Sequence, residues 1–383
     1  MTISPADLHA VTAPVTRARG LPNPCYTDSA VFAQEVGAVF APGWAGIGFE
    51  ADAPQPGSVT PIDFLGRPLL LARDLEGTLR VFENVCRHRG MTLVAEAGTR
   101  VRTLRCPYHA WCYDLDGRLR TTPHVGGPGN NRHDCIDRAQ LGLNEVRAHL
   151  WMGIVWVNLD GSAAPFNTHA APLRGRWAEV DRPVTAAPDT MFELEVACNW
   201  KLAVENYCES YHLPWVHPGL NSYSRLEDHY NIEVPGLFAG QGTRAYRPML
   251  AADGRRFPPI SGLSDWWQDG AEYVALFPNV LLGVHKDHMH AIVLMPEGPE
   301  RTVERVALLF PDAQVLQADW AEMRSAARQM WKEIFIEDIG VVEGMQRGRH
   351  AAGFDGGRFS PVMDSPTHLF HAWVADKMAA SSL

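Results

Sequence analysis

The sequence predicts an α+β fold in which a β-rich first half precedes a second half of mixed strands and helices. Short runs rich in β-branched, aromatic and leucine residues, separated by glycine-containing turns, fill residues 44–160. After residue 161, two stretches with helical spacing of apolar residues flank a region of strand-like runs. The length of 383 residues, of which 46% are hydrophobic, is enough for two or three domains with a substantial core.

Several short strands are expected in the first half. They are expected at residues 68–72, 79–85, 100–104 and 151–159, where apolar runs are bounded by turn residues. Residues 1–43 lie outside this pattern, and their composition alone does not assign them to either half. We expect them to form a separate segment that packs on the second half, residues 161–383.

A helix is expected near the start of the second half. It begins at Asn199, a favourable N-cap residue, and ends at His212, because Pro214 disfavours helical geometry at the preceding residue. The other expected elements are strands between residues 246 and 310, including 273–277 and 280–284, a long helix over residues 318–346, and a proline-containing linker over residues 162–188.

Charge and hydropathy exclude several classes of protein. The net charge is −10 and no run of Lys and Arg appears, so nucleic acid is not an expected partner. The longest apolar run, residues 150–159, is far shorter than the roughly 18 residues of a membrane span. The N-terminus lacks a basic start followed by an apolar core, and seven scattered cysteines do not form a disulfide framework. We therefore expect a cytoplasmic protein without membrane contact.

Two short clusters in the β-rich half each offer one thiolate and one imidazole. Cys86 and His88 lie in NVCRHRGM, and Cys106 and His109 lie in LRCPYHAWCY. Two Cys and two His can hold a tetrahedral zinc ion or a Rieske [2Fe–2S] centre. Zinc fingers usually pair Cys with Cys and His with His, so the alternation C-x-H, C-x2-H favours the Rieske cluster. Cys112 is expected to be a free thiol on the next strand.

A second candidate metal site lies at the end of the helix expected at Asn199. Glu205, Glu209 and His212 would share one face of that helix at positions i, i+4 and i+7. His217 follows after the break at Pro214, which allows its side chain to return toward His212. Two histidines without cysteine suit Fe(II), Zn or Cu.

An acidic residue on the long C-terminal helix would complete this site. Asp338 follows the apolar stripe of Trp331 and Ile334, where an unpaired carboxylate would be costly. Two His and one carboxylate form the facial triad of non-haem Fe(II) oxygenases, which leaves positions open for O2. Periodicity alone does not distinguish Asp338 from Glu337. A competing metal site at His288 and His290 remains open, because alternate strand residues share a face.

The two motifs together resemble the large oxygenase (alpha) subunit of the Rieske non-haem iron oxygenases. CPYHAWCYDLDG and EDIGVVEGMQRG are similar to the corresponding elements of that family. The resemblance implies an N-terminal β-rich Rieske [2Fe–2S] domain at residues 44–160 and a catalytic domain with a curved antiparallel sheet and helices, of the helix-grip type. It also implies the ligands, which are Cys86, His88, Cys106 and His109 for the cluster and His212, His217 and Asp338 for a mononuclear iron.

The same resemblance implies the assembly and the electron supply. In the family three subunits form a ring, and an acidic residue links a Rieske histidine of one subunit to a triad histidine of the next. Glu209 would link His212 to His109 of the neighbouring subunit. The sequence GQGTRA at 240–245 is a weak dinucleotide motif without a surrounding βαβ unit, and no plant-type ferredoxin motif is present. A separate flavin and iron–sulfur reductase that uses NAD(P)H is therefore implied.

The substrate class rests on a finer resemblance. ENYCESYHLPWVHP is similar to the branch that contains choline monooxygenase and the betaine and carnitine oxygenases, whose substrates are quaternary ammonium compounds. Hydroxylation of an N-methyl carbon would release formaldehyde. Aromatic side chains suit such a cation, and the candidates are Tyr211, Trp215, Tyr223, Trp266, Trp267 and Phe277. Two alternatives remain, an oxygenase for an aromatic acid or ring and a non-enzymatic zinc protein.

Overall fold

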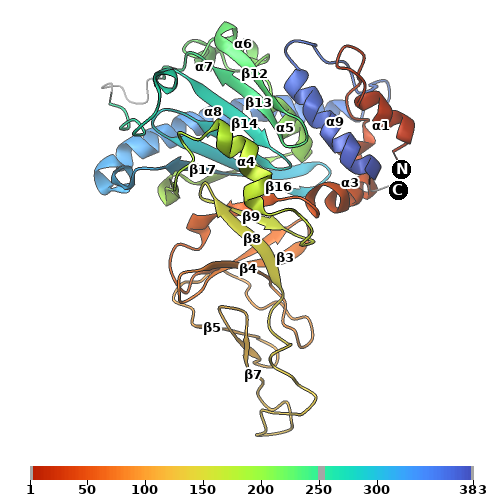
Figure 1. Ribbon diagram of the computed structural model, residues 1–383. Helices are drawn as coiled ribbons and strands as arrows, with labels where there is room; N and C mark the ends of the chain where they lie inside the picture. Colours follow the sequence, from red (N-terminus) through yellow and green to blue (C-terminus); the bar gives the residue numbers. More distant parts are fainter. Residues whose placement is uncertain (1–2, 249–254, 381–383) are drawn as a thin grey trace.

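The computed structural model describes residues 3–248 and 255–380 (Figure 1). A broad body contains the largest sheet and the longest helices, and a narrower lobe extends from it to a tip formed by β5, β6 and β7 (Figure 1). The lobe is built from the β-rich first half of the chain and the body mainly from the second half. The α+β class expected from the sequence is confirmed.

The lobe contains two antiparallel sheets. The six-stranded sheet has the order β1-β9-β8-β4-β3-β2 and the small sheet has the order β5-β6-β7. The strands are β1 (Ala45–Phe49), β2 (Val59–Phe64), β3 (Arg67–Arg73), β4 (Leu79–Glu83), β5 (Thr103–Arg105), β6 (Cys112–Asp114), β7 (Leu119–Thr121), β8 (Glu145–Trp151) and β9 (Ile154–Asn158). The single strand expected at residues 151–159 is wrong, because Met152 and Gly153 have φ angles of 50° and 66° and turn the chain back.

The body is built around an eight-stranded antiparallel sheet with the order β10-β17-β16-β15-β14-β13-β12, to which β11 adds through β17. The strands are β10 (Thr185–Ala186), β11 (Phe192–Val196), β12 (His229–Val234), β13 (Phe238–Thr243), β14 (Ala271–Leu276), β15 (Val280–Val284), β16 (Met289–Gly298) and β17 (Arg301–Phe310). The expected strand at 280–284 has the observed bounds.

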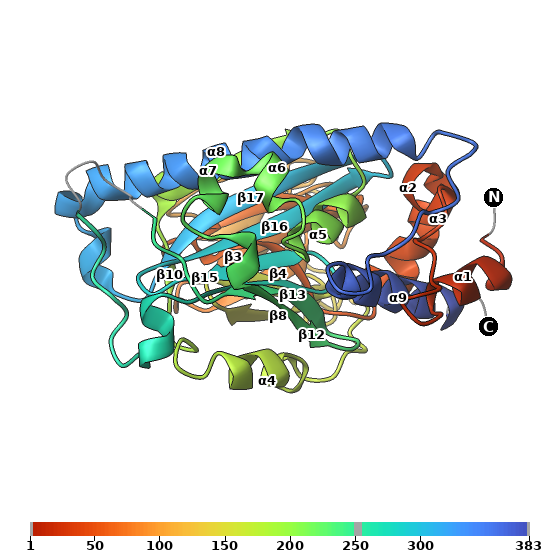
Figure 2. The ribbon, with the colours of Figure 1, turned by 90° about the horizontal axis from the view of Figure 1, so that it is seen from above.

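Helices cover both faces of this sheet. Helix α8 (Ala321–Gly348) and helix α5 (Trp200–Tyr207) lie on one side, and α4 (Phe166–Arg176) lies on the other (Figure 2). The expected linker at 162–188 thus contains a helix of its own. Two short helices, α6 (Leu213–Val216) and α7 (Pro218–Asn221), sit near the middle of α8.

Helix α5 is shorter than the sequence pattern predicts. Asn199 caps it as expected, since its side chain accepts a hydrogen bond from the Lys201 N–H, but the helix ends at Tyr207. The shared helical face expected for Glu205, Glu209 and His212 is therefore wrong. Glu205 turns into a buried network with Tyr26, whereas Glu209 and His212 lie in the turn that follows.

The N-terminal residues lie against the helices of the body. They form α1 (Pro5–Val11), α2 (Pro24–Thr27), α3 (Ser29–Glu35) and a π-helical turn (Val36–Phe40), and they lie beside α9 (Ser365–Ala380) in Figure 1. The Leu21 N–H donates to Nδ1 of His371 on α9 over 2.9 Å. Glu35 forms a fully buried ion pair with Lys201 of α5, with N–O distances of 2.7 and 2.8 Å.

Lobe and body share one hydrophobic core, which includes Ile47 of β1 and Leu294 of β16. Gly46 exchanges hydrogen bonds of 3.0 and 2.8 Å with the side chain of Asn279. A Cβ atom at Gly46 would lie 2.5 Å from Val280, so only glycine permits this approach. In the described part of the chain, no helix is both long and apolar enough to cross a membrane.

Candidate metal centres

The first centre is formed by two loops of the lobe with the same backbone geometry. Cys86 follows β4 and Cys106 follows β5, and each cysteine N–H donates to the carbonyl five residues later, over 2.8 Å. In each loop the residue four positions on, Gly90 or Ala110, returns a hydrogen bond of 3.0 Å and has a positive φ angle of 74° or 57°. The repeated turn presents one cysteine and one histidine from each loop.

The four side chains of this centre point into one region. Cys86 and Cys106 are buried free thiols, and the rings of His88 and His109 lie 4.7 Å apart. The Nδ1 atom of His109 is buried and has no hydrogen-bond partner among the residues that the structure describes. A buried nitrogen without a partner destabilises the fold, and a metal atom bound at Nδ1 would provide that partner. Burial raises the pKa of Cys86, whose Sγ lies 3.3 Å from the hydroxyl of Tyr113.

The spacing of these four residues fits a cluster better than a single ion. Within the described ranges, the only group of three or more His, Cys, Asp or Glu whose ligand atoms lie within 4.8 Å of one another is elsewhere in the molecule. A single tetrahedral zinc would need such proximity. A two-iron cluster spreads its cysteine and histidine ligands over two metal atoms.

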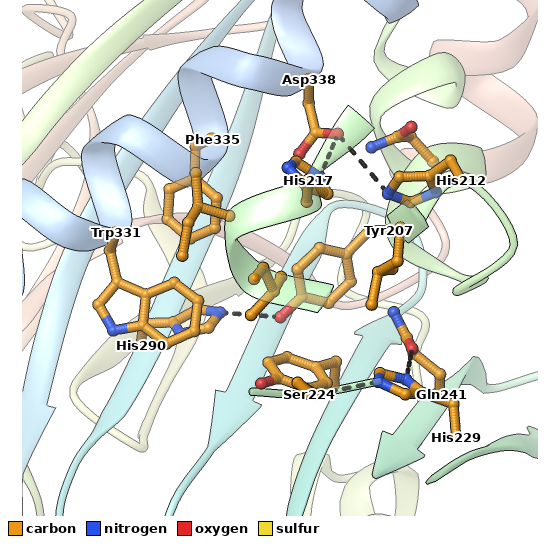
Figure 3. A pocket seen from close by; sticks show the side chains of 15 residues that line it. Tyr207, His212, His217, Ser224, His229, Gln241, His290, Trp331, Phe335 and Asp338 are labelled. Atoms are coloured by element: carbon orange, nitrogen blue, oxygen red, sulfur yellow. Dashed lines mark hydrogen bonds and ion pairs between the residues drawn. The ribbon is translucent and has the colours of Figure 1, made fainter. Parts of the chain in front are cut away.

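The second centre lies between α5, α6 and the middle of α8 (Figure 3). His212 precedes α6, His217 lies between α6 and α7, and Asp338 projects from α8. Oδ1 of Asp338 is 2.9 Å from Nε2 of His217 and 3.7 Å from Nε2 of His212. These three are the group that meets the distance criterion above, so they could hold one metal ion.

Each histidine of this second centre is oriented by a further carboxylate. Nδ1 of His212 lies 2.6 Å from Glu209, and Nδ1 of His217 lies 2.6 Å from Glu337. Both Nε2 atoms are thereby directed at Asp338. Burial lowers the pKa of His217, but Asp338 and Glu337 outweigh that effect and raise it. Glu337, which periodicity could not separate from Asp338, therefore holds the outer nitrogen of a histidine.

A cavity adjoins the three residues. One wall is aromatic and contains Tyr207, His290, Trp331 and Phe335 (Figure 3), and Tyr273 also lines the cavity. The opposite wall is polar, where His229 lies between Gln241 and Ser224 at 2.5 and 3.0 Å. The Gln241 amide also donates to the carbonyl of Glu209 over 3.1 Å.

The aromatic residues expected to surround a cation do not line this cavity. Tyr211, in the turn before α6, is 43% exposed, and Trp215, on α6, is 72% exposed. Phe277 packs on Phe370 of α9, and the others, Tyr223, Trp266 and Trp267, lie outside the lining. The aromatic side chains that do line the cavity, together with His290, come from α5, β14, β16 and α8. Their helical spacing at 331, 335 and 338 was the one sequence signal that could have identified them.

The histidines at 285–290 pair with aromatic side chains, and the described residues show no metal group there. Nε2 of His290 lies 3.0 Å from the hydroxyl of Tyr207, and Nε2 of His285 lies 3.2 Å from that of Tyr273. His288 lies between Asp287 and Trp331. Burial holds the pKa of His285 and His290 well below the usual range, so both are neutral.

The weak dinucleotide motif is explained by strand packing. Gly240 and Gly242 lie on β13, where a Cβ atom would come within 2.0 Å of the Tyr273 carbonyl and 2.3 Å of the Tyr230 ring, respectively. Cys112 lies on β6 as a free thiol, as expected.

Comparison with known families covers both halves of the chain. Residues 43–133 match the Rieske [2Fe-2S] domain, and residues 184–380 match the ring hydroxylating alpha subunit (catalytic domain). The second match alone covers more than half of the chain. Together they account for both candidate centres, and the cofactors of this fold are a Rieske cluster and a mononuclear iron that reacts with O2.

Individual proteins are similar over nearly the whole chain. The glycine betaine monooxygenase oxygenase subunit of Chromohalobacter salexigens is 28% identical, over 94% of this chain and 85% of its own. The carnitine monooxygenase oxygenase subunit of Acinetobacter pittii is 26% identical, over 88% and 86%. A crystal structure of the quaternary ammonium Rieske monooxygenase CntA with an inhibitor superposes with a TM-score of 0.78 at 23% identity, over 98% and 99% of the chains. The chain therefore belongs to the ring-hydroxylating alpha subunits and is a Rieske-type non-haem iron oxygenase.

Proposed function

We propose that this oxygenase is a monooxygenase that hydroxylates an N-methyl group of a quaternary ammonium compound. The proposed ligands are Cys86, His88, Cys106 and His109 for the [2Fe–2S] cluster and His212, His217 and Asp338 for the iron. When bound, the mononuclear iron supplies the position at which O2 is reduced and one of its oxygen atoms is inserted into a C–H bond.

The observation that carries the substrate class is the wall of the cavity. Within the described residues, the lining contains aromatic, aliphatic and polar side chains, a single carboxylate from Asp338, and no lysine or arginine. Faces of Trp331, Tyr207 and Phe335 attract a cation. An aromatic acid would lack a cationic partner there. Relatives that act on glycine betaine and carnitine support the same class.

The chain's own residues hold the reacting groups in place. Glu209 and Glu337 each fix the Nδ1 atom of a histidine, which keeps both Nε2 atoms directed toward Asp338. Phe335, 6% exposed, and Trp331, 2% exposed, keep water away from the cavity side of α8. His290 in this wall and His285 behind it are neutral and add no positive charge that would repel a cation.

The reaction requires O2, two electrons and two protons, and yields a hydroxymethyl ammonium compound and water. The hydroxymethyl compound is a hemiaminal, which breaks its C–N bond to give formaldehyde and the demethylated amine. The demethylation product is therefore a second, measurable consequence of the proposal.

The arrangement of the two centres supports electron transfer between copies of the chain. The cluster loops lie near the tip of the lobe, whereas α6 and α7 lie at the opposite end of the body (Figure 1). A homotrimer would bring His109 of one copy close to Glu209 of the next, and Glu209 would bridge it to His212. The electrons would come from a separate NAD(P)H-dependent reductase.

The test follows reoxidation of the chemically reduced cluster under O2, with choline, glycine betaine, carnitine and aromatic acids as probes. We expect one quaternary ammonium compound to accelerate reoxidation and to release formaldehyde in proportion to O2 consumed. Acceleration by an aromatic acid, with no formaldehyde from any ammonium compound, would overturn the substrate class. The variant Asp338→Ala should keep the visible cluster spectrum and lose product formation, which separates the two centres.

A further inference from the structure

A wall of buried side chains separates the cavity from a second hollow. The second hollow is narrow and is lined in part by Tyr246, His285 and Asp287. Trp331 lines the first cavity, and its ring packs on Tyr246 and His285, with ring centroids 6.4 and 5.0 Å away. Trp331, Tyr246 and His285 together therefore separate the cavity from the second hollow.

Hydrogen bonds fix the plane of this indole. Nε1 of Trp331 donates to Nε2 of His288 over 2.9 Å. Because Nε2 accepts, the proton of the neutral ring is on Nδ1, which donates to Oδ1 of Asp287 over 2.6 Å. His288 is fully buried, so loss of either partner would leave a buried polar group unpaired and would loosen this arrangement.

The cavity side of Trp331 is held as firmly. The ring of His290 lies 4.2 Å from the indole, centroid to centroid, and its Nε2 is bonded to the Tyr207 hydroxyl. Gly283 lies beneath this imidazole, and a Cβ atom there would come within 2.1 Å of it. The indole is thus packed against His290, His285 and Tyr246, and the rings of His285 and His290 lie 5.5 Å apart on the same side of it.

Helix α8 sets the distance from this wall to the proposed iron. Trp331, Phe335 and Asp338 all face the cavity (Figure 3). Seven residues separate Trp331 from Asp338, which corresponds to about 10 Å along a helix. Trp331 therefore lies at the end of the cavity that is remote from the proposed ligands.

We propose that Trp331, positioned by Asp287 and His288, sets the maximum length of the substrate. A substrate whose reacting carbon lies at the iron extends along α8 until it meets the indole. Removal of the indole extends the cavity toward Tyr246 and His285 and admits a longer molecule. The inference rests on the proposed function only in the identity of the cationic end of the substrate.

The experiment uses the complete oxygenase with two series of probes, n-alkyltrimethylammonium ions and n-alkylbenzenes, each from ethyl to decyl. O2 uptake and product are measured for every chain length. We expect a sharp upper length for the wild type and a limit at least two carbons longer for Trp331→Ala. An unchanged limit in Trp331→Ala would overturn the proposal. If only alkylbenzenes are consumed, the proposed substrate class fails while the length test still applies.

The positioning role is tested by a graded series. Asp287→Ala should make the upper length limit of the substrate less sharp and increase the hydrogen peroxide released per O2 consumed. Asp287→Asn keeps an oxygen acceptor for His288 and should restore the wild-type length limit. Trp44→Phe is the matched control for Trp331→Phe, because Trp44 is equally buried and donates a 2.9 Å bond from Nε1 to the Ala164 carbonyl, outside the cavity.

A readout independent of turnover completes the test. In protein labelled with 15N-tryptophan, the signal lost in Trp331→Phe identifies the Nε1–H of Trp331. We expect this N–H to exchange slowly with solvent in the wild type and at least tenfold faster in His288→Leu. Equal exchange rates would show that His288 does not hold the indole, whether or not any probe is consumed.

Discussion

The Nδ1 atom of His217 lies 2.6 Å from Oε2 of Glu337, the same separation that joins Nδ1 of His212 to Oε1 of Glu209. The two proposed iron histidines are therefore held by equivalent carboxylates from different elements. Glu209 precedes His212 by three residues, whereas Glu337 comes from α8, next to Asp338. Carboxylates in this position fix the ring and increase the basicity of the coordinating nitrogen.

Glu337→Gln should weaken iron binding by about 10–100-fold, because His217 loses its charged partner. Iron content after dialysis against a graded series of chelator concentrations measures this change. Glu333→Gln is the control, since Glu333 lies one turn earlier on α8 and its side chain accepts a hydrogen bond from Gln329, away from the proposed ligands. Iron retention equal to that of the control would contradict the role assigned to Glu337.

Glu209→Gln should reduce product formation at least tenfold even when excess iron keeps both metal centres loaded. The reason is the proposed bridge from His212 to His109 of a second copy, which a neutral amide supports poorly. Single-turnover oxidation of the reduced cluster measures the step directly. Glu227→Gln, a change at an exposed residue in the same region, should leave the rate unchanged. Wild-type rates in Glu209→Gln would show that the bridge is not required.

Lys201→Met should lower the free energy of unfolding by about 3–5 kcal/mol, because it leaves the carboxylate of Glu35 buried without its cation. Both side chains are 0% exposed, and burial raises the pKa of Glu35 despite the opposing charge of Lys201. Denaturant titration measures the loss. The exposed pair Arg301 and Glu195 provides the comparison, and Arg301→Met should cost less than about 1 kcal/mol.

His285→Gln should flatten the dependence of stability on pH in acid. Burial lowers the pKa of His285 well below 6.5, so the unfolded chain binds a proton that the folded chain does not. The contribution of neutral His285 to the free energy of unfolding is therefore fully present above the unfolded pKa. It falls below about pH 6.5, by at most about 1.4 kcal/mol per pH unit for one proton. Melting temperatures between pH 7.5 and 5 measure the slope. The exposed His350→Gln should keep the wild-type slope, and an unchanged slope in His285→Gln would contradict the prediction.

In both centres, the proposed ligands that lie within a few residues of each other in the sequence could be predicted from the sequence. Cys86 with His88 and Cys106 with His109 occupy single tight loops, and His212 with His217 flank one break in the helix. Their proximity follows from local geometry. Asp338 required the resemblance in addition, because Glu337 differs from it by only 100° around the helix and is itself used, as the partner of His217.

The cavity walls could not be predicted in the same way. Tyr207 became a wall residue because α5 ends there, five residues earlier than its pattern indicates. His290 and Tyr273 face the cavity through the register of β16 and β14 in an eight-stranded sheet, which is a property of long-range pairing. Trp215, an attractive candidate in the motif, points to solvent because α6 is a single turn on the surface.

The separation of the lobe tip from α6 and α7 has a consequence for assemblies that mix two different defective chains. If each turnover uses the cluster of one copy and the iron of another, a subunit without a cluster and a subunit without iron are defective in different ways. Refolding a mixture of Cys106→Ser and Asp338→Ala chains would create some junctions with two intact partners. Such a mixture would recover part of the wild-type product formation, although each variant alone is inactive. A protein in which electrons passed only within single chains would stay inactive at every mixing ratio.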